Sequence, residues 1–173
     1  LEGLKVKDVA TNTESSYFLD LTGALWSVGQ DTSGDLGSGV DSHTSVPVKV
    51  VEGNVTEVAA RNQTVLYRDQ NGSLHGFGSG GHGRLANNST SSRHSPIMVH
   101  DANVTSFASG ADHSAMVLTD GSLWTFGQNH RGQLGNGTKA HVSQPFRVEA
   151  SGVVDVSTYP ENTIYVKDDG SLW

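Results

Sequence analysis

Apolar and polar residues alternate over short stretches of this chain, and the alternation predicts β-strands rather than helices. Residues 104–108 (VTSFA) intersperse apolar and polar residues, as expected for a strand with one buried face. Apolar stretches follow at 115–118 and 123–126, and a fourth short one spans 145–148, where the leading proline suits a strand start or an edge strand. We therefore expect four short strands here, and no helix of useful length anywhere in the chain.

A recurring glycine marks the turn between the second and third of these strands. Asp120-Gly121 is a strong hairpin signal, because glycine readily adopts the positive φ that tight hairpin turns require. The same signal recurs along the chain and predicts four structural turn residues: Gly23, Gly72, Gly121 and Gly170.

The whole pattern repeats every 49 residues without insertion or deletion. It aligns on a Gly-x-Leu-Trp segment whose leucines are Leu25, Leu74, Leu123 and Leu172. The repeat divides a single segment, 1–173, into full units 6–54, 55–103 and 104–152 and a partial unit 153–173. Internal repeats of this size indicate stacked structural units.

Four short antiparallel strands in each unit describe a blade of a β-propeller. A unit this small cannot bury both of its faces alone, so it must stack on its neighbours. We predict an all-β fold of four-stranded antiparallel blades, about three and a half of them. The recurring Leu, Val and Trp positions are expected to form the core between blades.

The third unit carries the clearest motif. Residues 120–129 read DGSLWTFGQN, residues 132–138 read GQLGNGT, and residues 110–114 read GADHS. These segments resemble the repeat of the regulator of chromosome condensation family in its bacterial form, and the resemblance covers essentially the whole chain. It is weaker in the second unit, where His75 replaces Trp and Ala86 replaces Gly.

The resemblance implies a seven-bladed propeller of four-stranded blades. Known members of the family include an exchange factor for a nuclear GTPase and a bacterial inhibitor of β-lactamases. Many others are repeats within large secreted or surface proteins of bacteria. Since a closed propeller needs about four to eight blades, three and a half are too few. We expect a fragment of a longer chain; a homodimer that completes a seven-bladed ring and an open arc with exposed strand edges are the alternatives.

Composition narrows the class of partner. The net charge of −7 disfavours binding to nucleic-acid phosphates, so we expect no nucleic acid as partner. No apolar run approaches the roughly 18 residues of a membrane helix, and we expect no membrane insertion. The chain has no cysteine, which leaves the compartment open, although the resemblance favours an extracellular or cell-surface location. It begins with Leu rather than Met, so we expect a matured, excised or cut chain.

The histidines and aspartates are the candidate metal ligands in this sequence. The eight histidines show no metal-ligand spacing, and separate blades are expected to hold His43 and His94 well apart. Asp31, Asp35 and Asp41 share one Gly-Ser-rich loop, but their spacing does not fit a calcium loop. We therefore expect no metal ion and no cofactor.

His113 is interpreted as structural. The equivalent positions hold Ser15, Thr64 and Asn162, all polar. All four side chains are expected to order a turn by hydrogen bonds to the backbone.

The sequence contains no visible catalytic arrangement. There is neither a G-x-S-x-G nucleophile turn nor a phosphate-binding G-x-x-x-x-G-K segment. Recurrence of the glycine-rich segment 132–137 in each unit indicates blade turns rather than a phosphate loop. We therefore predict that the protein is not an enzyme.

The copies of the repeat differ most in their loops, so we expect binding residues there. The connections after the first and third strands carry large or charged side chains that break the repeat, and Tyr and Arg are common interface anchors. The candidates are Arg61, His82, His130, Arg131 and Tyr159. We predict a non-enzymatic protein-interaction or scaffold segment of a larger secreted or surface protein. The alternatives are a propeller that docks one protein, as an enzyme inhibitor or guanine-nucleotide exchange factor, and a carbohydrate-binding propeller.

Overall fold

The computed structural model describes residues 3–173. Their regular secondary structure consists of β-strands and one short 3₁₀ turn, η1 (Gly81–Gly83). The all-β prediction is therefore confirmed. The strands are β1 (Val6–Thr11), β2 (Ser15–Asp20), β3 (Leu25–Gly29), β4 (Thr44–Val51), β5 (Val55–Arg61), β6 (Thr64–Asp69), β7 (Leu74–Gly78), β8 (Arg93–His100), β9 (Val104–Ser109), β10 (His113–Leu118), β11 (Leu123–Gly127), β12 (Val142–Glu149), β13 (Val153–Tyr159) and β14 (Asn162–Lys167).

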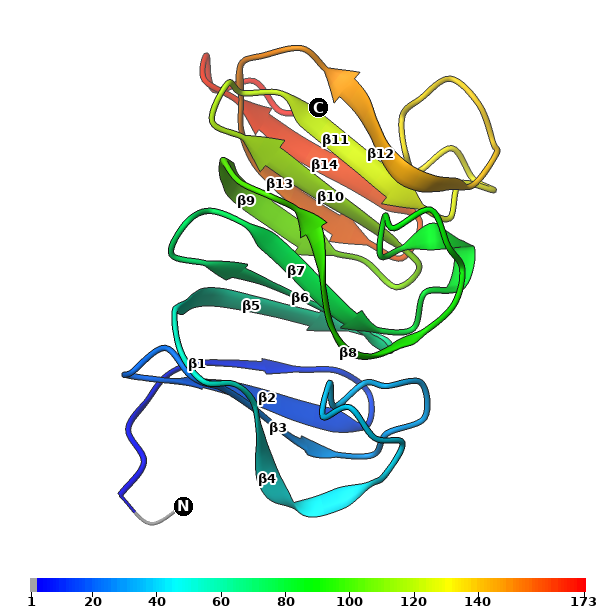
Figure 1. Cartoon of the computed structure of the whole chain (residues 1–173). Coiled ribbons are helices and arrows are strands. Elements are labelled where there is room, and N and C mark those ends of the chain that lie inside the picture. The colour runs from blue at the N-terminus through cyan, green and yellow to red at the C-terminus, as the bar shows by residue number, and fades with distance from the viewer. Residues whose placement is uncertain (1–2) are drawn as a thin grey trace.

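These strands form antiparallel sheets in which each strand pairs with its neighbours in the chain. The orders are β1-β2-β3-β4, β5-β6-β7-β8 and β9-β10-β11-β12, followed by the pair β13-β14. The sheets stack in chain order, so that β1 and β14 lie at opposite ends of the molecule (Figure 1). Four-stranded antiparallel blades are what the repeat predicted.

The core lies between successive sheets. Leu25, Leu74 and Leu123 are fully buried, each in a cluster that contains two apolar residues from the first strand of the next sheet. For Leu74 these partners are Val104 and Phe107. A buried leucine contributes about 1.5–3 kcal/mol relative to an exposed one, so the recurring leucine binds one blade to the next.

The expectation that tryptophan shares this core holds only in part: Trp124 packs against the margin of the cluster between the second and third blades, but none of the three tryptophans is fully buried. Trp26 and Trp124 are half-buried and Trp173 is 61% exposed. Successive side chains on a strand point to opposite faces, so a tryptophan directly after the core leucine points away from the following sheet. Trp26 instead stacks parallel to Phe18, with ring centroids 6.2 Å apart, and donates a hydrogen bond to Asp20.

The hairpin glycines join blades as well as strands. Gly23, Gly72, Gly121 and Gly170 have φ angles between 75° and 84°. The first three lie in four-residue connections, two residues longer than the shortest hairpin, as in 119–122 between β10 and β11. The Gly121 carbonyl accepts a hydrogen bond from the Val153 N–H, at 3.0 Å, and Gly23 and Gly72 accept the equivalent bonds. The turn therefore fixes the start of the next blade.

The two ends of the stack expose positions that are buried between blades. Val6 in β1 is 43% exposed, whereas its counterparts Val55 and Val104 are 1% and 3% exposed. At the other end Leu172 is 69% exposed, although the equivalent leucines are fully buried. We refer to these two surfaces, carried by β1–β4 and by β13–β14, as the end faces.

Candidate functional site

All five candidate binding residues lie along one edge of the stack. Because the strands are antiparallel, connections after the first and third strands of each blade emerge at the same end, on the right in Figure 1. We call this edge the loop rim. It consists of 12–14, 30–43, 62–63, 79–92, 110–112, 128–141 and 160–161, with the strand ends that enter them.

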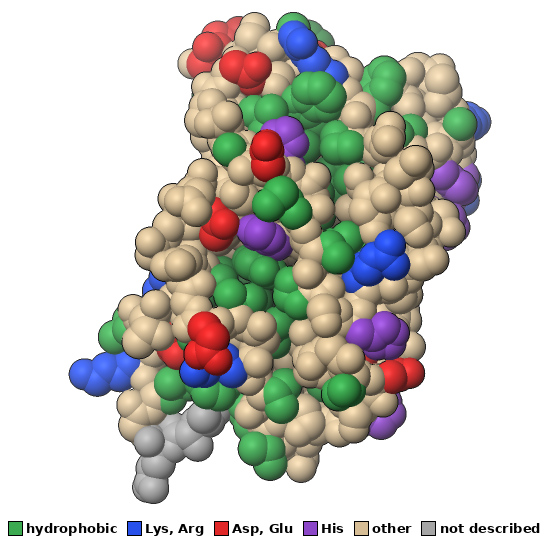
Figure 2. Space-filling model, in the orientation of Figure 1, with side chains coloured by type: hydrophobic (Ala, Val, Ile, Leu, Met, Phe, Trp, Pro, Cys, Tyr) green, Lys and Arg blue, Asp and Glu red, His purple; other side chains and the backbone are tan. Residues whose placement is uncertain are grey.

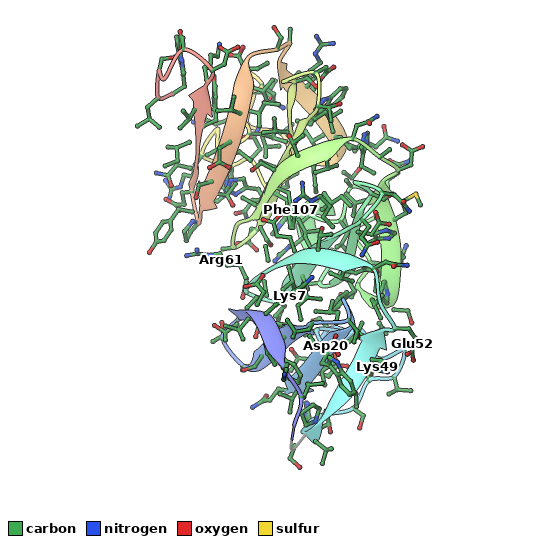
Figure 3. The ribbon with its side chains drawn as sticks, turned by 90° about the vertical axis from the view of Figure 1, so that its left-hand side faces the viewer. Lys7, Asp20, Lys49, Glu52, Arg61 and Phe107 are labelled. Atoms are coloured by element: carbon green, nitrogen blue, oxygen red, sulfur yellow. The ribbon has the colours of Figure 1, made fainter. Side chains whose placement is uncertain are left out.

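Arg61 and Tyr159 meet on this rim. They occupy the same repeat position two units apart, with Gly110, which has no side chain, in the unit between them. The Arg61 guanidinium carbon lies 4.5 Å from the centre of the Tyr159 ring, and Figure 3 shows Arg61 reaching from β5 toward β13. The Tyr159 side chain remains available, because the residue is 65% exposed. A cation–π contact at an exposed site contributes about 0.5–1 kcal/mol.

An open hollow surrounds this pair. Its lining comes from β5, β13 and β14: Arg61, Ser157, Thr158, Tyr159, Asn162 and Ile164. Ile164 is 49% exposed, so the hollow combines an apolar side, an aromatic ring and a fixed positive charge. Such a surface can bind an extended segment of protein by apolar contact and by hydrogen bonds to the guanidinium.

His130 and Arg131 converge on one carboxylate. The Arg131 Nε lies 3.4 Å and the His130 Nε2 4.0 Å from Oε1 of Glu161, which precedes β14. All three side chains are at least 44% exposed, and ion pairs of this kind contribute little to stability. Glu161 and Arg131 therefore form a weak, exposed ion pair at the rim, beside the His130 ring, rather than a fixed structural link.

His82 forms a separate contact. It adopts a φ of 59° in η1, and its ring lies edge-on to that of His141, with centroids 4.7 Å apart. Burial, reinforced by His141, lowers the pKa of His82, which favours its neutral form. Among the five candidates, Arg61 thus contacts Tyr159, His130 and Arg131 share Glu161, and His130 lies near enough to His82 to help lower the pKa of His82.

Arg84 positions the rim, and the sequence reasoning missed it. The residue is 5% exposed and pairs with Asp112 across the blade boundary at 2.5 Å. Its guanidinium also donates to the carbonyls of Gly81 and Ala111, at 2.9 and 2.7 Å. The only signal in the sequence is an arginine at a repeat position that holds Asp35 and Gln133 elsewhere.

His113 differs from its repeat counterparts. Ser15 and Thr64 donate to backbone carbonyls within their own blades, at 2.6 and 2.9 Å, as expected. His113 is fully buried, and its Nε2 lies 3.0 Å from the Thr163 hydroxyl in β14. Its bond therefore joins two blades instead of ordering a turn. Burial lowers the pKa of His113 to about 4.

A second polar cluster lies between the first two blades. One carboxylate oxygen each of Asp31 and Asp41 and one ring nitrogen of His94 all lie within 4.8 Å of one another. The backbone N–H of Asp31 also donates to Nδ1 of His43, at 2.8 Å. The expectation that His43 and His94 are held well apart is wrong, because the connection 30–43 reaches the start of β8 and both histidines approach Asp31.

Asp35 adds to the negative charge of this connection. Its side chain is fully buried, and burial, with a contribution from Asp31, raises the pKa of Asp35 to about 6. The described residues offer no ion-pair partner to Asp31, Asp35 or Asp41.

Residues 3–173 contain no helix long and apolar enough to cross a bilayer.

Two protein-family models, both of the same repeat, match the chain. A model described as "Regulator of chromosome condensation (RCC1) repeat" matches residues 71–117 and 120–158, and a second model of the same description matches 104–133. No curated protein sequence matches the chain.

Solved structures with the same fold include yeast RCC1 (Prp20) bound to Kap60, at a TM-score of 0.78 and 18% identity over 96% of this chain and 42% of that one. Prp20p from Saccharomyces cerevisiae, described with its binding to Gsp1p and histones, gives a TM-score of 0.80 at 18% identity over 96% and 43%. Human WBSCR16 gives 0.57 at 22% identity over 96% and 58%. The chain thus spans about two fifths of the length of the yeast proteins.

Proposed function

Because the chain belongs to the regulator of chromosome condensation repeat family, we propose that it is a non-enzymatic propeller segment that binds a protein partner through its loop rim. Propellers of this family are typically binding or exchange-factor proteins rather than catalysts. The resemblance seen in the sequence is confirmed, and it suggests a protein-interaction or exchange-factor type of function.

The observation that carries this proposal is the Arg61–Tyr159 pair. A repeat fixes the positions that stack the blades, whereas these two residues share one repeat position and differ in type. They stack on each other in an exposed hollow, where they contribute little to the core. Arginine and tyrosine are among the residues that most often dominate binding energy at interfaces.

Yeast Prp20p supports a protein as the class of partner. It shares the fold of this chain, and its solved structures are described with Kap60, Gsp1p and histones. Docking to one specific protein, as an exchange factor or an inhibitor, is the second candidate, and the family resemblance favours the exchange-factor form. Acceleration of nucleotide release from a bound GTPase would distinguish exchange from scaffolding.

The test begins with identification of the partner by a photo-cross-linker placed at position 159. The affinity of that purified partner is then measured for the wild-type chain and for Arg61→Ala and Tyr159→Ala. Loss of a central anchor costs about 2 kcal/mol or more, so we expect binding to weaken roughly 30-fold.

Glu52→Ala is the matched control. This side chain is 89% exposed at the opposite edge of the stack, where it pairs with Lys49 at 2.9 Å (Figure 3). We expect its removal to leave the affinity unchanged. Equal effects of Glu52→Ala and Tyr159→Ala, or cross-links confined to the opposite edge, would overturn the loop rim as the binding surface.

We also propose that further blades of a longer secreted or surface protein cover the two end faces. Exposed Val6 and Leu172 support this, because their repeat counterparts are buried wherever a neighbouring blade is present. A second copy that completes the ring is the alternative. A monomeric mass by sedimentation up to high micromolar concentration would exclude the homodimer, and the reading frame around this segment would show added blades and a secretion signal.

A further inference from the structure

We propose that Asp31, Asp41 and His94 bind a divalent transition-metal ion of the zinc type, which fastens the connection 30–43 of the first blade to β8 of the second. The three donor groups lie within 4.8 Å of one another, although they come from two blades. Figure 2 shows histidine and acidic side chains gathered over the β3–β4 connection and the start of β8.

The buried carboxylate of Asp31 is the first argument. The residue is 2% exposed, and neither carboxylate oxygen accepts a hydrogen bond from any described residue. Nδ1 of His94 is also buried without a partner. A buried carboxylate costs several kcal/mol unless a counter-charge or hydrogen-bond donors compensate it. A cation held between these groups would supply that compensation.

The repeat itself provides the second argument. The residue equivalent to Asp31 in the third unit is Asn129, which is fully buried. Its amide nitrogen donates to Asn136 Oδ1 and to the Thr138 carbonyl, at 2.9 and 3.0 Å, and its oxygen accepts from Leu134 N–H at 2.9 Å. Aspartate has no N–H to donate, so Asp31 cannot make the first two bonds. A metal ion can replace them as the group that holds the connection in place.

The next blade boundary lacks the ligands while keeping the backbone contact. Gly39 N–H donates to the His94 carbonyl at 2.7 Å, and the equivalent bond from Asn88 to Ser143 is 2.8 Å. The positions equivalent to Asp31, Asp41 and His94 in that boundary are held by Gly80, Thr90 and Ser143. The backbone contact therefore belongs to the fold, whereas the three ligands are specific to the first boundary.

The donor set selects the class of metal. One imidazole nitrogen with two carboxylate oxygens suits Zn²⁺ and similar first-row ions, whereas Ca²⁺ and Mg²⁺ prefer oxygen ligands alone. Ligands around a tetrahedral zinc ion lie about 3.3 Å apart, so the site must close by up to about 1.5 Å from the present spacing. Asp41 is exposed in a loop and can make that movement, and a water molecule would complete the coordination.

The test is a titration of the purified chain, without an affinity tag, with Zn²⁺ alone, followed by calorimetry and by thermal unfolding. We expect one ion per chain and a rise in Tm of about 5 °C at saturating zinc. Equimolar Ca²⁺ or Mg²⁺ should give no comparable rise. X-ray absorption of the zinc complex should show one imidazole in the coordination shell.

Variants are taken from the repeat itself, so that each replacement residue is already tolerated at an equivalent position. His94→Ser and Asp31→Asn copy the third unit and should weaken zinc binding roughly tenfold or more, while circular dichroism shows a retained fold. His100→Val, which copies Val51 at the equivalent position of the first unit, is the control in the same strand and should bind zinc like the wild type. A wild-type chain that binds no zinc, or binding that survives both ligand substitutions or is lost equally in the control, would overturn the proposal. So would preferential binding of Ca²⁺.

Discussion

Leu74 and Leu172 occupy the same repeat position, yet the structure predicts opposite consequences for their loss. Leu74 is fully buried between the second and third blades, against Val104 and Phe107. Leu172 is 69% exposed on an end face. Truncation of each to alanine therefore tests whether the repeated leucine stabilises the chain through blade stacking.

The expected magnitudes differ several-fold. Leu74→Ala removes buried methyl groups and leaves a cavity in the boundary, which costs about 3 kcal/mol of unfolding free energy. Leu172→Ala removes groups that water already contacts, so its effect should remain within about 0.5 kcal/mol. For a chain of this size the first change should lower Tm by roughly 6–12 °C.

The assay is urea unfolding followed by tryptophan fluorescence, at a concentration where sedimentation shows a monomer. Far-ultraviolet circular dichroism provides a second probe of the same transition. If both substitutions lowered the unfolding free energy by similar amounts, or if Leu74→Ala did not lower it, the assignment of this position to the core between blades would be refuted.

Three further predictions concern single residues. Gly121→Val should destabilise the chain more than Gln128→Ala, measured as the difference in Tm, because a β-branched residue resists the φ of 75° at Gly121. His113 has a pKa of about 4 when folded, against about 6.5 when unfolded, so the unfolded chain takes up this proton first as the pH falls. Its stabilising contribution, up to about 3 kcal/mol, is present above pH 6.5 and lost between pH 6.5 and 4, and urea midpoints measured against pH should lose this dependence in His113→Asn. Arg84→Ala should cost about 3 kcal/mol by leaving buried acceptors and Asp112 unpaired, and a variant as stable as the wild type in urea would contradict that role.

The architecture could be predicted from the sequence because its determinants are local. The apolar–polar pattern of the strands and the turn glycines can each be recognised from a few neighbouring residues. The 49-residue repeat can be recognised because the same residues recur at a constant spacing. The same local rule would also have placed the tryptophans correctly: Trp26 directly follows Leu25, so the two must point to opposite faces of the sheet.

Contacts between blades could not be predicted in the same way. Arg61 meets Tyr159 across an intervening unit, and that distance depends on the rotation between blades, which no single repeat specifies. The approach of His94 to Asp31 depends on how far the connection 30–43 extends over the next blade. In each case the informative signal is a position where one copy departs chemically from the others, and only the fold shows which departures meet.

Blade stacking is tested most directly by amide hydrogen exchange at Val55, Val104 and Val153. Each of these N–H groups donates to the hairpin glycine carbonyl of the preceding blade, at 3.0 Å. We predict that all three amides exchange slowly, with protection approaching that of the strand interiors. Rapid exchange at these three positions, like that expected for the Val9 amide, which donates only to the exposed Asp8 side chain at 2.8 Å, would contradict a structure in which each blade is hydrogen-bonded to the turn of the one before it.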